Sequence, residues 1–346
     1  MATYDGLFEA TGLQGWCGET TDGPLTMAEL MARARGEDAA DVATPLMNTP
    51  FPSLDVLHES CATIPRSRDM TEAVEQGFLA IKDPLKVVLD PITQPLSWAL
   101  DASLELFQAV PWFIMIPLLV ILTWFSTKRI GVTVFVAAAF LFMSFINFYD
   151  DAMQTLSIIF VCTLISIALG VPIGIAMSRS NALQRGTIPI LDMLQTLPTF
   201  VYLVPLIYLF SVTESKLYGI AIILYAIVPV VRLTDLGIRL VDKEVIEAAD
   251  AFGMTARQKL WKVEVPLALP NIMAGVNQTI MMSLAMVVIA SLVSAPGLGV
   301  KVLAGIRNLE LGVGLVAGFC IVLLAVLLDR STKAALARVD VSGTAR

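Results

Sequence analysis

The sequence has few of the residues on which metalloproteins and redox enzymes depend. It contains one histidine, His58, and four cysteines in 346 residues, and no C-x-x-C pattern occurs. We therefore expect neither a zinc site nor dithiol redox chemistry. Charge is also scarce: 15% of the residues are charged, whereas an average soluble domain has about 25%.

Motifs for nucleotide chemistry and for secretion are missing as well. No Walker A pattern (G-x-x-x-x-G-K-S/T) occurs, so we do not expect this chain to bind or hydrolyse ATP by itself or to be an enzyme. Basic residues are not clustered, which argues against nucleic acid as a partner. The first residues, MATYDGLFEATG, lack the basic and apolar regions of a signal peptide, so membrane insertion is expected to depend on internal segments.

The chain is instead rich in apolar residues, and its charge is unevenly distributed. Hydrophobic residues make up 56% of the chain, and the mean hydropathy is +0.77. These values are typical of a membrane protein. Residues 1–108 carry 17 acidic and 6 basic residues, a net charge of −11, and the remainder carries 13 and 17, a net charge of +4. The sequence therefore predicts an acidic polar head and an apolar body.

The apolar body contains segments long enough to cross a bilayer. A membrane-spanning helix needs about 20 largely apolar residues. We expect an all-α polytopic membrane protein with about seven transmembrane helices. The predicted spans are 107–126, 130–148, 153–177, 188–210, 217–235, 270–293 and 312–328.

Lysine and arginine in the short loops predict the orientation of the spans, because cytoplasmic loops are enriched in both. Basic residues follow spans one, three, five and seven, whereas the loops on the other side contain YDD (149–151) and VTESK (212–216). The loop 294–311 is an exception, since it contains Lys301 and Arg307. We expect an extracytoplasmic, periplasmic N-terminal tail (1–106), a transmembrane domain (107–330) and a cytoplasmic C-terminal tail (331–346).

The acidic tail gives weaker signals. Apolar residues at helical spacing predict amphipathic helices near 70–82 and 95–107. Cys17 and Cys61 both lie in this tail. In an oxidising periplasm they can form a disulfide, and two free thiols are the alternative.

The stretch EAADAFGMTARQKLWKVEVP (247–266) is polar although apolar segments lie on both sides of it. A helix is predicted over 242–252, and Gly253 stands where a left-handed C-cap belongs. Thr255 is placed to cap a second short helix, which Pro266 and Pro270 are expected to end before span six. The first helix carries four apolar residues on one face: Val245, Ala248, Ala249 and Phe252. This face either packs on the chain's own bundle or contacts another protein.

The same stretch resembles the EAA loop of ABC-importer permeases. That pattern is Glu-Ala-Ala, three residues, Gly, nine residues and Ile-x-Leu-Pro, and the matching residues here are Glu247, Ala248, Ala249, Gly253 and Pro266. Val263 and Val265 stand in place of Ile and Leu. Further stretches between 191 and 314 resemble the ProU/OpuA-type permeases of osmoprotectant importers, which have the type I importer architecture.

The resemblance implies a function and a set of partners. The loop 239–266, with Phe252 beside its glycine, would dock on a separate ATPase that holds ATP and Mg²⁺. A homodimer of the permease in the bacterial inner membrane would bind two ATPase copies and one periplasmic substrate-binding protein, which would dock on loops 211–217 and 294–311. The substrate class implied is a small zwitterion or quaternary amine, such as glycine betaine, proline betaine, choline, carnitine or trimethylamine N-oxide.

A translocation path is harder to predict, because intramembrane polar residues also serve as packing contacts. Asp192 is an ionisable residue within a span and is a candidate by default, although capping or snorkelling explains it equally well. The other candidates are Gln195, Tyr202, Gln278, Met282 and Met286. An ion-coupled secondary transporter is the alternative function, but it would need more ionisable residues near the midplane or internal repeats. A membrane signalling subunit is a further alternative.

Overall fold

The computed structural model describes residues 4, 8, 11–12, 16–17 and 51–339, with side chains described to Lys333. The described residues form helices and connecting loops, with no strand among them. The chain divides into two compact units, Met1–Leu85 and Lys86–Arg346, and each is described by itself. Most of the predicted tail before residue 51 and the end of the predicted cytoplasmic tail lie outside the described residues.

The first unit is held together by a disulfide. Cys17 and Cys61 are bonded to each other, which settles the alternative that the sequence leaves open. Both lie in a small apolar cluster with Phe8, and Leu57 of α3 (Leu54–Ser60) packs against it. A disulfide of this kind supplies stability where the apolar core is small.

The helix α4 (Ser67–Ala109) begins in the first unit and continues into the second. Both segments that were predicted to form amphipathic helices, 70–82 and 95–107, are helical, and they belong to this single 43-residue helix. The helix runs through Pro84, Pro91 and Pro95. Each proline removes one backbone donor without ending the helix here.

Four helices of the second unit are long and apolar enough to cross a membrane: α7 (Tyr149–Arg179), α10 (Ser215–Arg239), the continuous stretch Ala256–Val293 and Leu311–Lys333 of α15 (Leu311–Val339). A fifth is counted if α4 and α5 (Trp112–Thr127), which meet at 109°, form one bent span. The helix α6 (Ile130–Phe145) has 16 residues and reaches about 24 Å, short of the ~30 Å of a hydrocarbon core. The predicted count of seven spans is not confirmed.

The predicted span 188–210 is not one helix. The structure has α8 (Asn181–Thr196) and α9 (Leu203–Leu209), with a loop between them. The break comes at Leu197, which adopts an extended conformation before Pro198. A residue that precedes proline disfavours helical geometry, which explains where α8 ends.

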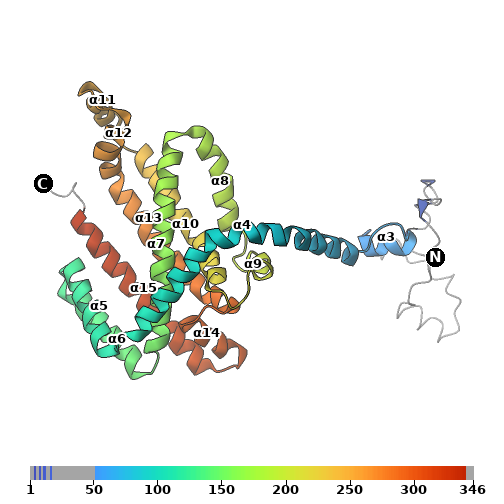
Figure 1. Cartoon of the computed structure of the whole chain (residues 1–346), viewed down its shortest axis with the longest axis horizontal. Helices are drawn as coiled ribbons and strands as arrows, with labels where there is room; N and C mark the ends of the chain where they lie inside the picture. The colour runs from blue at the N-terminus through green and yellow to red at the C-terminus, as the bar shows by residue number, and fades with distance from the viewer. Residues whose placement is uncertain (1–3, 5–7, 9–10, 13–15, 18–50, 340–346) are drawn as a thin grey trace. The chain divides into compact units, whose positions relative to one another are not determined.

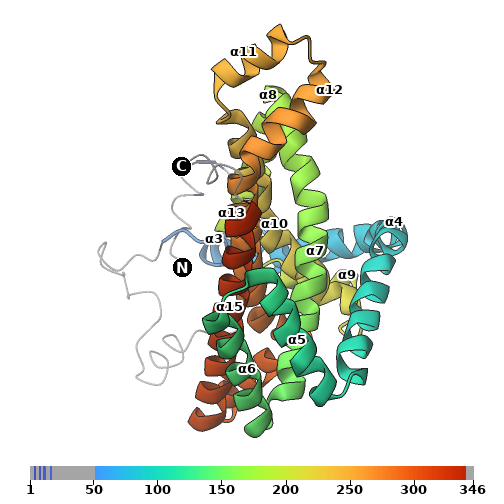
Figure 2. The ribbon, with the colours of Figure 1, turned by 90° about the vertical axis from the view of Figure 1, so that its left-hand side faces the viewer.

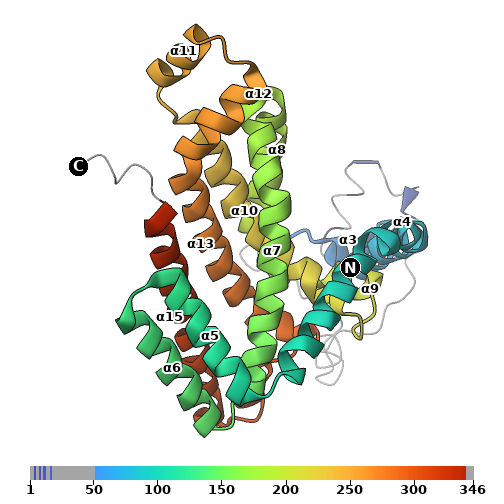
Figure 3. The same cartoon turned by 60° about the vertical axis from the view of Figure 1, so that its left-hand side comes forward.

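The helix α10 is the centre of the second unit and lies between α7 and α13 (Val265–Ala290) (Figure 3). Small residues allow this close packing. A Cβ added at Gly174 of α7 would lie 2.7 Å from the carbonyl oxygen of Val231, and one at Gly275 of α13 would lie 3.0 Å from the Cα of Val230. The G-x-x-x-G spacing of 170–174 therefore serves helix packing.

Short helices close the two ends of this unit. At one end lie α11 (Lys243–Ala251) and α12 (Ala256–Lys259), beside the turn between α7 and α8 (Figure 2). At the opposite end lies α14 (Leu298–Arg307), near the start of α7 (Figure 1). The N-terminal end of α10 also belongs to that opposite end, where Lys216 forms an ion pair of 2.8 Å with Asp90 of α4. One end of the second unit therefore carries α11 and α12, and the opposite end carries α14 and the Lys216–Asp90 ion pair.

Candidate functional site

The polar insert folds as two helices joined by a glycine turn. The side chain of Asp242 caps α11 by accepting the backbone N–H of Glu244 at 3.0 Å. Gly253 follows the helix with φ +72°, as predicted. Its N–H donates to the carbonyl of Asp250 at 2.9 Å, and the N–H of Met254 donates to that of Ala249 at 3.2 Å. These two bonds define a Schellman motif, which needs the left-handed residue that glycine supplies.

The second helix is capped and tied back to the first. Thr255 and Gln258 form a reciprocal capping box, as the sequence predicts for the threonine. The Nζ of Lys259 lies 2.8 Å from a carboxylate oxygen of Asp250 in α11. The cap, the turn and this ion pair hold α11 and α12 at a defined angle, which makes a rigid elbow.

The elbow is continuous with the long helix that follows, and here the sequence prediction is wrong. Pro266 and Pro270 do not end the helix, because both lie in α13. A π-helical turn, η3 (Leu260–Glu264), precedes Pro266, and the N–H of Val265 donates to the carbonyl of Leu260, five residues back. Such an insertion changes the local hydrogen-bond register and lets the chain pass a proline. The second helix of the elbow and α13 therefore form one continuous helical stretch, Ala256–Val293.

The apolar residues of the elbow divide between a packed face and an outward face. Ala249 is buried, and Ile246 packs against the apolar cluster around Ile238 and Ile272. Phe252 is 85% exposed and Trp261 is 56% exposed. Only Ala249 of the predicted stripe is buried, so the stripe does not pack as a unit on the bundle. Glu247, Ala248 and Val245 are exposed.

This outward face is suited to a protein partner, because exposed aromatic side chains at the polar end of a unit are typical of binding surfaces. We call Val245, Glu247, Ala248, Phe252 and Trp261 the coupling surface. Trp261 is not among the residues that the sequence predicts for this site. The available signal was a tryptophan within a stretch that is otherwise polar and helical, where no span would bury it.

An ion pair attaches the base of the elbow to the rest of the bundle. Nη1 of Arg179, at the end of α7, lies 3.1 and 3.0 Å from the two carboxylate oxygens of Glu264 in η3. The side chain of Glu264 is only 5% exposed, whereas that of Arg179 is 41% exposed. A nearly buried carboxylate needs such a partner. The ion pair therefore connects the base of the elbow to α7.

A cluster of charged and polar residues beside the elbow joins α7, α8 and α10. Arg239 donates to the carboxylate of Asp235 at 2.9 Å, to the side-chain oxygen of Asn181 at 2.8 Å and to the carbonyl of Met177 at 2.7 Å. The other oxygen of Asp235 accepts from Gln184 at 2.6 Å. Both oxygens of this buried carboxylate are bonded, so the cluster fixes the three helices relative to one another.

The structure brings some of the candidate path residues together and separates others. The hydroxyl of Tyr202 donates to Sδ of the fully buried Met286 at 3.7 Å. Asp192 of α8 pairs with Arg232 of α10, which is not among the candidate path residues. Gln195 and Met282 are partly buried, and Gln278 is exposed on α13.

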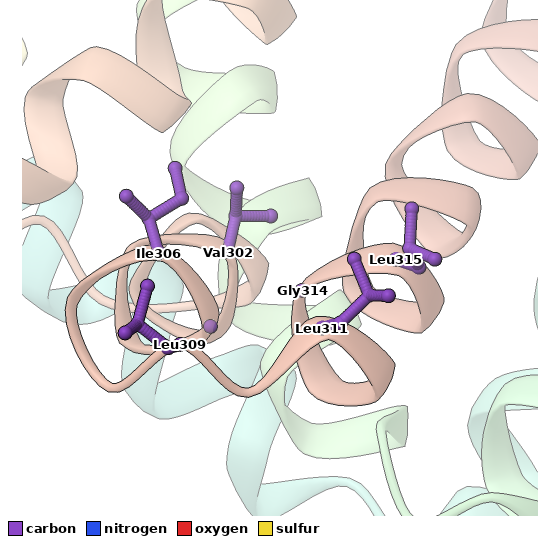
Figure 4. A pocket seen from close by; sticks show the side chains of 7 residues that line it. Val302, Ile306, Leu309, Leu311, Gly314 and Leu315 are labelled. Carbon is purple, nitrogen blue, oxygen red and sulfur yellow. The ribbon is translucent and has the colours of Figure 1, made fainter.

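A groove at the opposite end of the unit is lined by apolar residues. It lies between the end of α14 and the start of α15, in the loop 294–311 and just beyond (Figure 4). Its lining residues are Val302, Gly305, Ile306, Leu309, Leu311, Gly314 and Leu315. None of them is charged, so the groove offers no site for an ionic ligand.

Comparisons with known proteins agree with this arrangement. The sequence profile of a family described as "Binding-protein-dependent transport system inner membrane component" matches residues 166–341, which include the elbow, α10 and α13. A solved structure titled "Inward facing conformations of the MetNI methionine ABC transporter" superposes with a TM-score of 0.50 at 22% identity, covering 56% of this chain and 95% of the other. That likeness concerns the fold alone.

Curated relatives are more similar in sequence. The glycine betaine/carnitine transport permease protein GbuB of Listeria monocytogenes is 42% identical over 70% of this chain and 87% of its own length. The glycine betaine/proline betaine transport system permease protein ProW of Escherichia coli is 36% identical over 84% and 81%. The trimethylamine N-oxide permease TmoV of Ruegeria pomeroyi is 33% identical over 73% and 38%. The chain therefore belongs to the family of inner membrane components of binding-protein-dependent transport systems.

Proposed function

We propose that the chain is the permease subunit that imports a small osmoprotectant or quaternary amine. The observation that carries the substrate class is the naming of GbuB and ProW for glycine betaine, at identities of 42% and 36% over most of their length. The candidate substrates are glycine betaine, proline betaine, choline, carnitine and trimethylamine N-oxide. ATP and Mg²⁺ belong to a separate ATPase, and a substrate-binding protein delivers the ligand.

The coupling surface is the proposed contact with the ATPase. Its aromatic residues project from the end of the unit, and the elbow beneath them is stiffened by the Gly253 turn and the Lys259–Asp250 pair. Closure of two ATPase subunits would bring the elbows of two permease copies together. Pro266 and the continuous helix α13 would carry that displacement into the membrane. Alternating access then follows, with ligand received from outside and released to the cytoplasm.

We propose that the elbow is cytoplasmic and that the N-terminal tail is periplasmic. The end of α7, the start of α8 and the elbow share one end of the second unit and carry Arg179, Arg185 and Arg257, respectively. The segment of α4 that contains Asp90 contacts α10 at its other end. The Cys17–Cys61 disulfide in the tail fits an oxidising compartment.

We also propose that the candidate path residues line a route along α8, α10 and α13. Tyr202 and Met286 meet in the described structure, and Asp192 faces Arg232 one helix away. The helix α8 also carries Gln195, and α13 also carries Gln278 and Met282. The ion-coupled alternative would use Asp192, and this carboxylate is paired with Arg232.

The test is reconstitution of the permease with its ATPase and binding protein in proteoliposomes. We expect glycine betaine with the binding protein outside to raise ATP turnover and to produce ATP-dependent uptake. Uptake driven by an ion gradient without ATP, or an ATPase rate that is indifferent to every candidate amine, would contradict the proposal.

A further inference from the structure

An ion pair joins α8 to α10, which is one of the candidate membrane spans. Oδ1 of Asp192 accepts a hydrogen bond from Nη2 of Arg232. Arg232 is seven residues before the end of α10 at Arg239, and at 1.5 Å per residue this is about 10 Å into the helix. Asp192 is eleven residues after the start of α8 at Asn181, or about 16 Å by the same measure. Arg232 therefore lies inside the candidate span α10, and the ion pair holds Asp192 of α8 beside that part of the span.

The pair is not enclosed by its own chain. The side chains of Asp192 and Arg232 are 52% and 38% exposed. Charged side chains that face lipid at this depth are costly, so intramembrane charges face a bundle interior or a water-filled cavity. This face of α8 and α10 is therefore expected to border a polar space in the assembled transporter.

The guanidinium group also retains unused hydrogen-bonding capacity. Nε of Arg232 is buried and has no hydrogen-bond partner among the described residues. The contrast with Asp235, three residues further along α10, is informative. That carboxylate is buried and both of its oxygens are bonded, to Arg239 and to Gln184. The cluster at Asp235 is a closed structural contact, whereas the Asp192–Arg232 pair is open.

Resting on the proposed function, we propose that Asp192 and Arg232 form an intramembrane binding site for a zwitterionic substrate. The carboxylate of the substrate would accept hydrogen bonds from Arg232, and its quaternary ammonium would lie against Asp192. A quaternary ammonium has no N–H to donate, so its attraction to a carboxylate is purely electrostatic. Arginine suits the carboxylate of the substrate, because its planar guanidinium group can donate two parallel hydrogen bonds to a carboxylate.

This arrangement predicts selectivity between charge types. A zwitterion can separate the ion pair and still leave each protein charge with a partner of opposite sign. A simple cation with the same head group would occupy Asp192 and leave Arg232 unpaired, which is unfavourable at low dielectric. The site should therefore prefer glycine betaine over choline, independently of the preference of the binding protein.

The test measures ligand binding to the permease–ATPase complex in nanodiscs without the binding protein, by saturation-transfer NMR. Glycine betaine and choline are the probes, and only complexes of the correct size on gel filtration are compared. For the wild type we expect stronger transfer to glycine betaine than to choline. Arg232→Lys should weaken glycine betaine binding by about tenfold, because lysine cannot form the paired hydrogen bonds that arginine forms with a carboxylate. The same variant should leave choline binding unchanged.

The matched control is Lys333→Gln. Lys333 pairs with Asp329 on α15 and is 62% exposed, so the change breaks an ion pair away from the site and should leave both probes unaffected. Equal transfer to both probes in the wild type, or an equal loss for both in Arg232→Lys, would overturn the proposed site and indicate a purely structural pair. ATP-dependent uptake by the complete wild-type assembly is measured in parallel, and its absence would overturn the proposed function instead.

Discussion

Replacement of Gly253 by valine is expected to uncouple ATP hydrolysis from transport. The glycine has φ +72°, and a Cβ placed there would meet nothing within 4 Å, so the effect is one of backbone strain and not of crowding. A left-handed residue with a side chain costs about 1–2 kcal/mol, and β-branching adds to the strain. The Schellman turn would open, and the angle between α11 and α12 would no longer be fixed. We expect ATP-driven uptake in proteoliposomes to fall by about tenfold, since 1.4 kcal/mol corresponds to that factor.

Two further variants separate strain from other effects. Gly253→Asn should retain most of the uptake, because asparagine tolerates the left-handed region. Gly318→Val changes a glycine of α15 that also has open space around its Cα and no positive φ, so it should transport normally. If Gly253→Val transports as well as these two, the turn is not required for coupling.

Replacement of Arg179 by methionine should destabilise the join between the elbow and α7. Glu264 would remain 5% exposed with no counterion. Leaving a buried charged group unpaired costs about 1–3 kcal/mol once the exposure of the arginine is allowed for. We expect a lower midpoint of thermal unfolding for the purified complex and a loss of uptake that exceeds the loss of ATPase activity.

The double variant Arg179→Met/Glu264→Met provides the control. Replacing both charges by apolar groups of similar size is often nearly neutral, so the melting midpoint should recover. Lys333→Met, which breaks an exposed ion pair on α15, should change stability by less than about 1 kcal/mol. If Arg179→Met and Lys333→Met lower the midpoint equally, the Arg179–Glu264 contact is an ordinary surface pair.

Local rules predicted the elbow well. Gly253 and Thr255 were assigned from the sequence because caps and turns depend on a few adjacent residues, and both assignments are confirmed. The same rules failed at Pro266 and Pro270, which were expected to end a helix. The π-helical turn at Leu260–Glu264 changes the register of the backbone hydrogen bonds before Pro266, and no residue pattern in the sequence predicts this turn.

Features that depend on contacts between distant segments were not predictable. Asp192 was identified as an isolated intramembrane charge because its partner, Arg232, is 40 residues away and lies on another helix. The sequence leaves the Cys17–Cys61 bond open because the bond depends on an oxidising compartment, and the contact between the two cysteines appears only in the structure. Hydropathy likewise marked 188–210 as one span, because an average over 20 residues does not register the break at Leu197 and Pro198.

The central claim is that the coupling surface touches the ATPase on the cytoplasmic side. The most direct measurement places a photo-crosslinker on Phe252→Cys, since the native cysteines are either disulfide-bonded or buried. The control is Leu309→Cys, an 89% exposed site at the opposite end of the unit. In inside-out vesicles that contain the whole assembly, we predict an adduct with the ATPase subunit from position 252 and none from position 309. An adduct from position 309 alone, or labelling of position 252 from the periplasmic side, would contradict the account.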